Sequence, residues 1–137
     1  FTVSYVDLGT DATVAWGAVD FKFRNNTTYP IKVEAIIKDK AVEIVFRGTN
    51  EHPGRTITVE TKVEKEYPFN VVEEKVNTLQ PGQVVVKQNG MTGYYVTAKR
   101  IFKQGDNVQV ETLSPSWYSK LDKIIQKGIE RETQSAS

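Results

Sequence analysis

The sequence predicts an all-β protein, because apolar and polar residues alternate with a period of two along most of the chain. The alternation is clear in residues 14–24, 31–38 and 42–46. Short segments rich in Asn, Asp, Gly and Pro separate the runs, as expected between strands joined by turns. The hydrophobic share of 39% is below the roughly 45–50% of ordinary globular domains. We therefore expect small antiparallel sheets with little compact core.

The first part of the chain reads as a meander of three strands. Residues 14–24 form the expected first strand, and Asn25–Thr28 supply the turn. Tyr29 precedes a proline, which favours an extended restart into residues 31–38. Asp39 and Lys40 then connect to residues 42–46. Because the chain starts at Phe1 and residues 1–5 already alternate, we expect this segment to begin inside a domain whose earlier part lies upstream.

A boundary is expected near Asn50. Residues 48–55 (GTNEHPGR) combine Gly, Asn and Pro without periodic apolar residues. We therefore divide the chain into residues 1–50, a second module over residues 51–131 and a frayed tail over residues 132–137. The strands expected in the second module are residues 57–67, 69–76, 83–88, 94–103 and 108–113.

Residues 117–131 allow two interpretations. Ser114-Pro115 resembles a helix start, and one helical face would carry Trp117, Leu121, Ile124, Ile125 and Ile129. An extended reading of residues 123–127 competes with the helix.

Composition excludes several function classes. The 18 Lys and Arg residues against 17 Asp and Glu give a net charge of +1 without a basic block, so nucleic acid is not an expected partner. The absence of Cys removes thiol nucleophiles, disulfides and thiolate metal sites. The longest apolar runs, such as residues 84–86, are too short to span a bilayer. We expect neither a cofactor nor catalysis by this chain.

Two polar groups are weak candidates for a site. Asp7 and Asp11, with Asp20 further along, offer carboxylates to a hard cation, although the segment also reads as a turn. His52 is the one histidine and lies beside Glu51, which makes it a weak metal candidate in a Pro-Gly linker.

Aromatic residues are the stronger candidates. Tyr94, Tyr95, Trp117 and Tyr118 can offer flat rings for stacking on sugars, with O–H and N–H groups as polar handles. Tyr94 and Tyr95 are adjacent, so one of them points away from the core side of a strand. The alternative is that these rings only pack across the strands.

The stretch VSYVDLGTDATVAWGAVDFKFRNNTTYP, residues 3–30, resembles the C-terminal end of the VanW family, which is named after vancomycin-resistance clusters. The resemblance extends over about residues 1–48. It implies that the larger, Cys- and His-containing part of such a domain lies upstream.

Residues 55–128 resemble the five-glycine (G-five) domain of bacterial surface proteins. The resemblance is carried by the run from VETKVEKEYPFN to QVETL and by the closing IIQKG, with glycines at positions 82, 90, 93, 105 and 128. It implies an elongated sheet module, binding of N-acetylglucosamine and an extended segment at residues 123–127. Independently of the family, we expect Gly90 and Gly105 to lie in turns that require positive φ.

Together, these observations predict a fragment of an extracellular, cell-envelope-associated bacterial protein. We expect it to bind or scaffold peptidoglycan or another N-acetylglucosamine-containing glycan, with weak self-association through sheet edges as a further possibility. The alternative is an accessory C-terminal part of a peptidoglycan-modifying enzyme whose catalytic half lies upstream.

Overall fold

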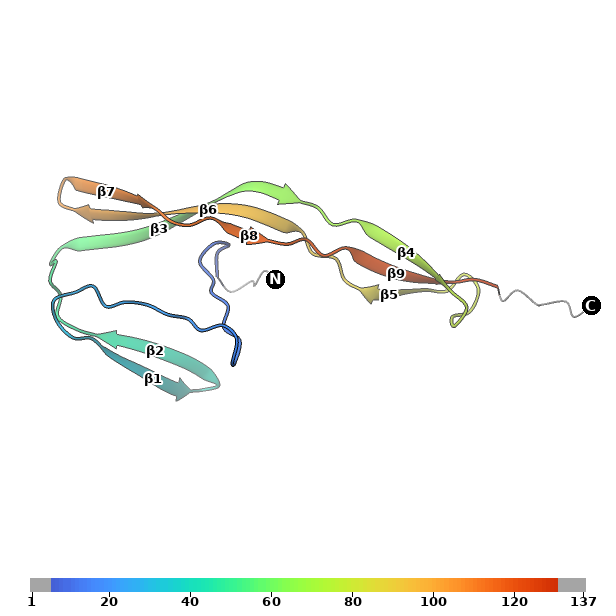
Figure 1. Ribbon diagram of the computed structural model, residues 1–137, viewed down its shortest axis with the longest axis horizontal. Coiled ribbons are helices and arrows are strands. Elements are labelled where there is room, and N and C mark those ends of the chain that lie inside the picture. Colours follow the sequence, from blue (N-terminus) through green and yellow to red (C-terminus); the bar gives the residue numbers. More distant parts are fainter. Residues whose placement is uncertain (1–5, 131–137) are drawn as a thin grey trace, which may run out of the picture. The chain divides into compact units, whose positions relative to one another are not determined.

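The computed structural model describes residues 6–130, which form nine strands and no helix (Figure 1). The predicted all-β class is confirmed. The expected strand at residues 1–5 and the frayed tail at residues 132–137 lie outside the described residues. The strands are β1 (Lys32–Lys38), β2 (Ala41–Arg47), β3 (Arg55–Tyr67), β4 (Val71–Val76), β5 (Val84–Gln88), β6 (Gly93–Gln104), β7 (Asn107–Thr112), β8 (Ser116–Tyr118) and β9 (Lys123–Gly128). No helix within the described part is long and apolar enough to cross a membrane.

The described residues divide into two compact units. Unit 1 contains residues 6–11, 59–100 and 110–130, and unit 2 contains residues 12–58 and 101–109. The predicted domain boundary near Asn50 stays a prediction.

Unit 2 contains the hairpin of β1 and β2, which pair antiparallel from Lys32 opposite Arg47 to Lys38 opposite Ala41. Asp39 and Lys40 form its two-residue turn at φ 51° and 63°, the positive values that a type I′ turn requires. Lys32 and Arg47 lie 2.8 and 2.7 Å from the carboxylate of Glu34 on the charged face. This hairpin forms as the alternation predicts.

The strand predicted over residues 14–24 is wrong. In its place, the chain turns at Gly17 (φ +74°), and Ala15 makes an isolated bridge to Val19. Phe21 and Phe23 keep their alternation but remain 65% and 55% exposed. Alternation marks a face, whereas a strand also requires a neighbouring backbone, and no described strand pairs with this segment.

The polar turn predicted at residues 25–28 is confirmed. The side-chain oxygen of Asn25 accepts hydrogen bonds from the backbone N–H and the hydroxyl of Thr27, at 3.0 and 2.7 Å. The Asn25 amide group donates to the backbone oxygen of Tyr29 at 2.9 Å. Asparagine in this role replaces backbone bonds that a strand would have made.

The remaining strands form two sheets. In one, the order is β3-β6-β7 with β8 also paired to β6, and in the other it is β4-β9-β5. Three stretches of chain pass from one sheet to the other, namely β3 to β4, β5 to β6 and β8 to β9. The backbones of Met91 and Leu121 bond to each other between the sheets, at 2.8 and 2.9 Å.

The pairing of β4 with β9 is parallel, from Val71 opposite Lys123 to Val76 opposite Gly128, which differs from the antiparallel expectation. β4 and β9 both lead away from the β3-β6-β7 sheet. β5 leads back toward that sheet and pairs antiparallel with β9. Segment 123–128 is therefore a strand, so the helical interpretation is wrong and the extended one is confirmed.

The buried hydrophobic core of the described residues is small. Val96, Ala98 and Tyr118 are the buried hydrophobic residues, at 1%, 5% and 8% exposure. All three belong to β6 and β8 of unit 1. The predicted lack of a large compact core is therefore confirmed for this part of the chain.

Candidate functional site

The two faces of β6 have different environments. Side chains alternate along a strand, so Tyr94, Val96 and Ala98 share one face and Tyr95, Thr97 and Lys99 share the other. A Cβ built on Gly9 would lie 3.1 Å from the Val96 side chain, so the chain near Gly9 covers the first face. The second face carries the polar and aromatic groups described below.

Pairing with β8 extends both faces. Tyr94 lies opposite Tyr118, and Tyr95 lies opposite Trp117. The two adjacent tyrosines thus lie on opposite faces, and Tyr95 is the one that lies with Trp117 on the second face.

Three rings on the second face form what we call the aromatic shelf, defined as Tyr67, Tyr95 and Trp117. The centroids of Tyr95 and Trp117 are 4.3 Å apart with planes at 34°, and those of Tyr67 and Trp117 are 6.1 Å apart at 32°. Trp117 is nevertheless 66% exposed. Its neighbours therefore restrain the indole while much of its surface remains in solvent.

A cation lies at one end of the shelf. The Lys65 ammonium lies 5.0 Å from the centroid of the Tyr67 ring, within the range of a cation–π contact. This contact restrains the ring of Tyr67, a residue that was not among the candidates predicted from the sequence.

Tyr118 has a different role from the other candidates. It is 8% exposed, and its hydroxyl accepts the Gly9 N–H at 2.7 Å and donates to the Asp11 carboxylate. Burial, followed by the bond to Asp11, raises the pKa of the Tyr118 hydroxyl. Because the ring is covered, it is not available as a stacking surface and instead ties the chain near Gly9 and Asp11 to β8.

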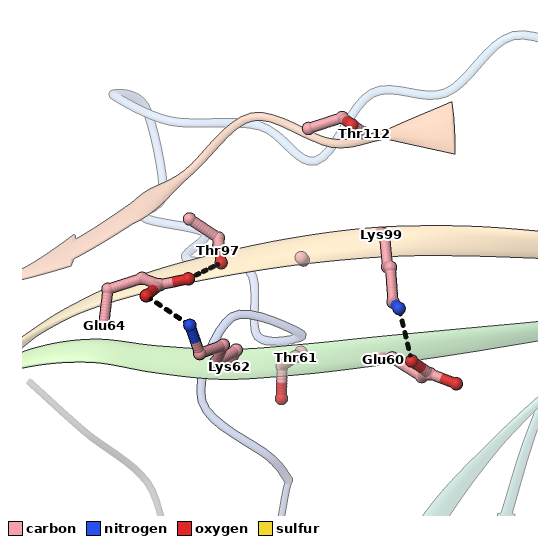
Figure 2. A pocket seen from close by; sticks show the side chains of 8 residues that line it. Glu60, Thr61, Lys62, Glu64, Thr97, Lys99 and Thr112 are labelled. Carbon is pink, nitrogen blue, oxygen red and sulfur yellow. Dashed lines mark hydrogen bonds and ion pairs between the residues drawn. The ribbon is translucent and has the colours of Figure 1, made fainter. Parts of the chain in front are cut away.

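A groove of about 490 Å³ lies on unit 1 beside β3, β6 and β7 (Figure 2). We call it the polar groove. It is lined by Glu60, Thr61, Lys62, Glu64, Thr97, Ala98, Lys99 and Thr112.

Glu64 is the best-held polar group of this groove. One carboxylate oxygen accepts the Thr97 hydroxyl at 2.9 Å and the other lies 2.8 Å from the Lys62 ammonium. The hydrogen bond from Lys62, followed by that from Thr97, lowers the pKa of Glu64. Glu64 is therefore an ionised acceptor fixed from two sides (Figure 2).

A second ion pair lies further along the groove, where the Lys99 ammonium is 2.8 Å from the Glu60 carboxylate. The side chains of Lys99 and Glu60 are 49% and 56% exposed, so both are accessible to a ligand. The groove thus offers charges of both signs together with the hydroxyls of Thr97 and Thr112.

The shelf and the groove are neighbours along β6. Tyr95 belongs to the shelf, and Thr97, two residues further along β6, belongs to the groove. Two residues of a strand span about 7 Å. A chain-like ligand can therefore contact aromatic rings and polar groups together.

The weaker candidates are not brought together. The Asp7 backbone oxygen closes a turn with Thr10, Asp11 bonds to Tyr118, and Asp20 lies 4.0 Å from Lys22. Within residues 6–130 no group of three or more His, Asp or Glu side chains is arranged to hold a metal ion, and His52 belongs to no such group.

Sequence reasoning missed Tyr67 and the polar groove. Tyr67 ends a strand just before Pro68 and carried no signal beyond its aromatic ring. The groove joins residues from three strands, and pairing between distant strands is not visible in local periodicity. The alternation of Glu60, Lys62 and Glu64 did mark one polar face of β3.

Comparison with known proteins gives two results. Residues 1–47 match the model of the family described as "VanW like protein", as the first resemblance predicted. No curated protein matches the chain.

Two solved structures are also similar to part of the chain. One, described as "IgA1 Protease G5 domain structure", is 24% identical, with 60% of this chain and 100% of that chain covered and a TM-score of 0.39. The other, described as "Crystal structure of HP0197-G5", is 21% identical, with 54% and 97% covered and a TM-score of 0.31. Both descriptions name the domain type that the sequence of residues 55–128 resembles.

Proposed function

We propose that this chain is a binding module of the bacterial cell envelope that holds a glycan containing N-acetylglucosamine, as found in peptidoglycan, on the aromatic shelf. The observation that carries the proposal is the Trp117 indole, which is stacked 4.3 Å from Tyr95 and yet 66% exposed. Aromatic faces bind sugar rings because stacking removes apolar ring surface from water while the sugar hydroxyls stay solvated. The VanW-like match over residues 1–47 and the G5 resemblance support a place at the cell envelope.

The geometry of the shelf supports the proposal. Tyr67 and Tyr95 restrain Trp117 from two sides, so little side-chain entropy is lost when a ligand covers the indole. The polar groove next to Tyr95 supplies hydroxyl and carboxylate groups for hydrogen bonds to sugar hydroxyls. Tyr118 serves by positioning β8, and therefore Trp117, through its bonds to Gly9 and Asp11.

We assign no catalysis to this chain, and the proposed partner is a cell-wall glycan rather than a nucleic acid. The second candidate function is that of an accessory arm of a peptidoglycan-modifying enzyme, which the VanW-like match favours. In that case the same shelf would bring the enzyme to its polymer. Self-association through sheet edges remains a lesser proposal, because the many charged side chains of the long strand β3 oppose uncontrolled pairing.

Co-sedimentation with purified peptidoglycan tests the proposal. The wild-type chain is expected to sediment with the polymer, and Trp117→Ala is expected to weaken binding by about 1 kcal/mol or more, the usual value of an aromatic contact beyond its area. Trp16→Ala is the matched control, since Trp16 is fully exposed and belongs to unit 2. Equal retention of both variants would contradict the role of the shelf, and absence of wild-type binding would contradict the proposed function.

A further inference from the structure

Lys65 brings a positive charge to the aromatic shelf that is not neutralised by a carboxylate within residues 6–130. Its ammonium lies 5.0 Å from the centroid of the Tyr67 ring, and a cation–π contact attracts the ammonium but leaves its charge in place. Other lysines of unit 1 do pair with carboxylates, at 2.8–3.2 Å, and these are Lys62, Lys87, Lys99 and Lys120. Lys65 therefore differs from them in having a charge that is available to a ligand.

The carboxylates next to Lys65 in the sequence do not take this charge. Glu64 is already held by the Lys62 ammonium at 2.8 Å and the Thr97 hydroxyl at 2.9 Å. Glu66 follows Lys65 on β3, so its side chain points to the opposite face of the strand. The Lys65 ammonium, which has three N–H donors and no acceptor, therefore suits an anionic group of the ligand.

The distances along the shelf place this cation close to a bound sugar. The Tyr67 ring, on which the Lys65 ammonium lies, has its centroid 6.1 Å from that of Trp117. The ammonium is therefore at most about 11 Å from the Trp117 centroid. Because the proposed function places one sugar on Trp117, the next sugar of the same glycan can extend over Tyr67 toward Lys65.

We propose that the shelf and Lys65 together bind a glycan in which the sugar next to the stacked one carries a free carboxylate. This inference rests on the proposed function, because the stacked sugar is the one on Trp117. In peptidoglycan, N-acetylglucosamine alternates with N-acetylmuramic acid, whose lactyl group ends in a carboxylate wherever no peptide is attached. The ligand class thus narrows to a glycan that contains peptide-free muramic acid.

NMR titration of the full chain with four disaccharides, followed at the Trp117 indole, tests the inference. Two of them differ in one group: N-acetylglucosaminyl-N-acetylmuramic acid and the same disaccharide with its lactyl carboxylate converted to the amide. The third is the neutral N-acetylglucosamine disaccharide. The fourth joins N-acetylglucosamine to glucuronic acid, which carries its carboxylate directly on the sugar ring.

The free acid is expected to bind about threefold tighter than its amide, as one solvent-exposed ion pair would give. High salt is expected to reduce this preference by screening. The glucuronic acid disaccharide is expected to bind less tightly than the muramic acid form, because its carboxylate lacks the reach of the lactyl group.

Variants locate the preference. Lys65→Gln is expected to bind the acid and the amide equally and to leave the affinity for the neutral disaccharide unchanged. Lys65→Arg keeps the positive charge and is expected to keep the preference. Lys75→Gln is the matched control, because Lys75 is also an exposed strand lysine of unit 1 without a carboxylate partner among the described residues, but it lies on β4 in the other sheet.

The outcomes separate this inference from the proposed function. If the neutral disaccharide binds and the acid and amide bind equally, the carboxylate site is wrong and glycan binding stands. If the preference persists in Lys65→Gln, the carboxylate is bound elsewhere and the assignment to Lys65 is overturned. Tighter binding of the glucuronic acid form would overturn the assignment to muramic acid. If no saccharide binds, the proposed function fails and this inference fails with it.

Discussion

At the scale of single residues, Tyr118 shows how one hydroxyl links distant parts of the sequence. It lies 109 residues from Gly9 and 107 from Asp11 along the chain and bonds to both. The side chain therefore stabilises the covered face of β6, where Val96 is 1% exposed.

Tyr118→Phe is expected to destabilise unit 1 by about 1–2 kcal/mol, because the Gly9 N–H and the Asp11 carboxylate lose their partner. Urea unfolding followed by the amide signals of β6 and β8 measures the change. Tyr94→Phe is the control, since its hydroxyl makes no hydrogen bond within the described residues, and it is expected to change stability little. Equal effects of the two variants would show that the Tyr118 bonds do not contribute.

Glu64 gives a prediction that depends on pH. Its pKa is lowered below the ordinary value of 4.5, chiefly by Lys62 and then by Thr97. The ionised carboxylate therefore stabilises the fold above the unfolded-state value, and this contribution is lost as pH falls through the lowered folded-state pKa.

Carbon-detected NMR titration of the Glu64 carboxyl measures that pKa. Lys62→Met is expected to raise it more than Thr97→Val, in the order of the two causes. The stability difference between wild type and Glu64→Gln is expected to shrink at acidic pH. An unchanged midpoint in both variants would mean that these hydrogen bonds do not hold the carboxylate.

At the scale of elements, glycines explain why β9 pairs where it does. A Cβ on Gly128 would lie 1.9 Å from the backbone oxygen of Gln80, so only glycine lets the β4–β5 connection pass so close to β9. Gly82 is different, since it has φ +81° and open space around it. Gly128 is needed because the backbone of Gln80 lies so close, and Gly82 is needed because of its positive φ.

Gly128→Ala is expected to disrupt the β4-β9-β5 sheet, because the added methyl would collide with backbone. Gly82→Ala is expected to cost only about 1–2 kcal/mol, the usual penalty of left-handed backbone. The hydrogen-exchange rates of the Lys123–Gly128 amides are measured in both variants to compare the stability of the sheet. If the two variants exchange alike, close approach at Gly128 is not what fixes the sheet.

Much of the strand pattern was predictable, because local alternation and turn residues carry it. The β1–β2 hairpin, the strands of the second module and the positive φ of Gly105 (+56°) follow the sequence. Residues 14–24 do not, since alternation cannot supply a pairing partner. Gly90 was predicted to need positive φ, but a Cβ there would instead lie 2.3 Å from the Phe69 ring, so its reason is close packing.

The candidate site was predictable only in part, because local sequence patterns do not show which distant segments pair. Tyr95 and Trp117 were identified from their ring chemistry, and the choice between Tyr94 and Tyr95 required the register with β8. Burial of Tyr118 depends on the chain near Gly9, which is far away in sequence. The groove depends on pairing between distant strands.

At the scale of the whole molecule, we expect the chain to divide near Asn50. Limited proteolysis with a broad-specificity protease is expected to cut first within residues 48–55, where Gly48, Pro53 and Gly54 leave backbone exposed. Mass spectrometry of the first fragments identifies the site. First cleavage inside residues 94–110 would place the division elsewhere.

The central claim is that the aromatic shelf binds sugar, and one titration tests it most directly. An N-acetylglucosamine trimer is added to the isotope-labelled chain, and the two indole N–H signals and the backbone amides are followed by NMR. The account predicts saturable shifts at the Trp117 indole and at the amides of Tyr95 and Thr97, with the Trp16 indole unmoved. No shift at Tyr95 or Trp117 at millimolar sugar, or equal shifts at Trp16 and Trp117, would contradict it.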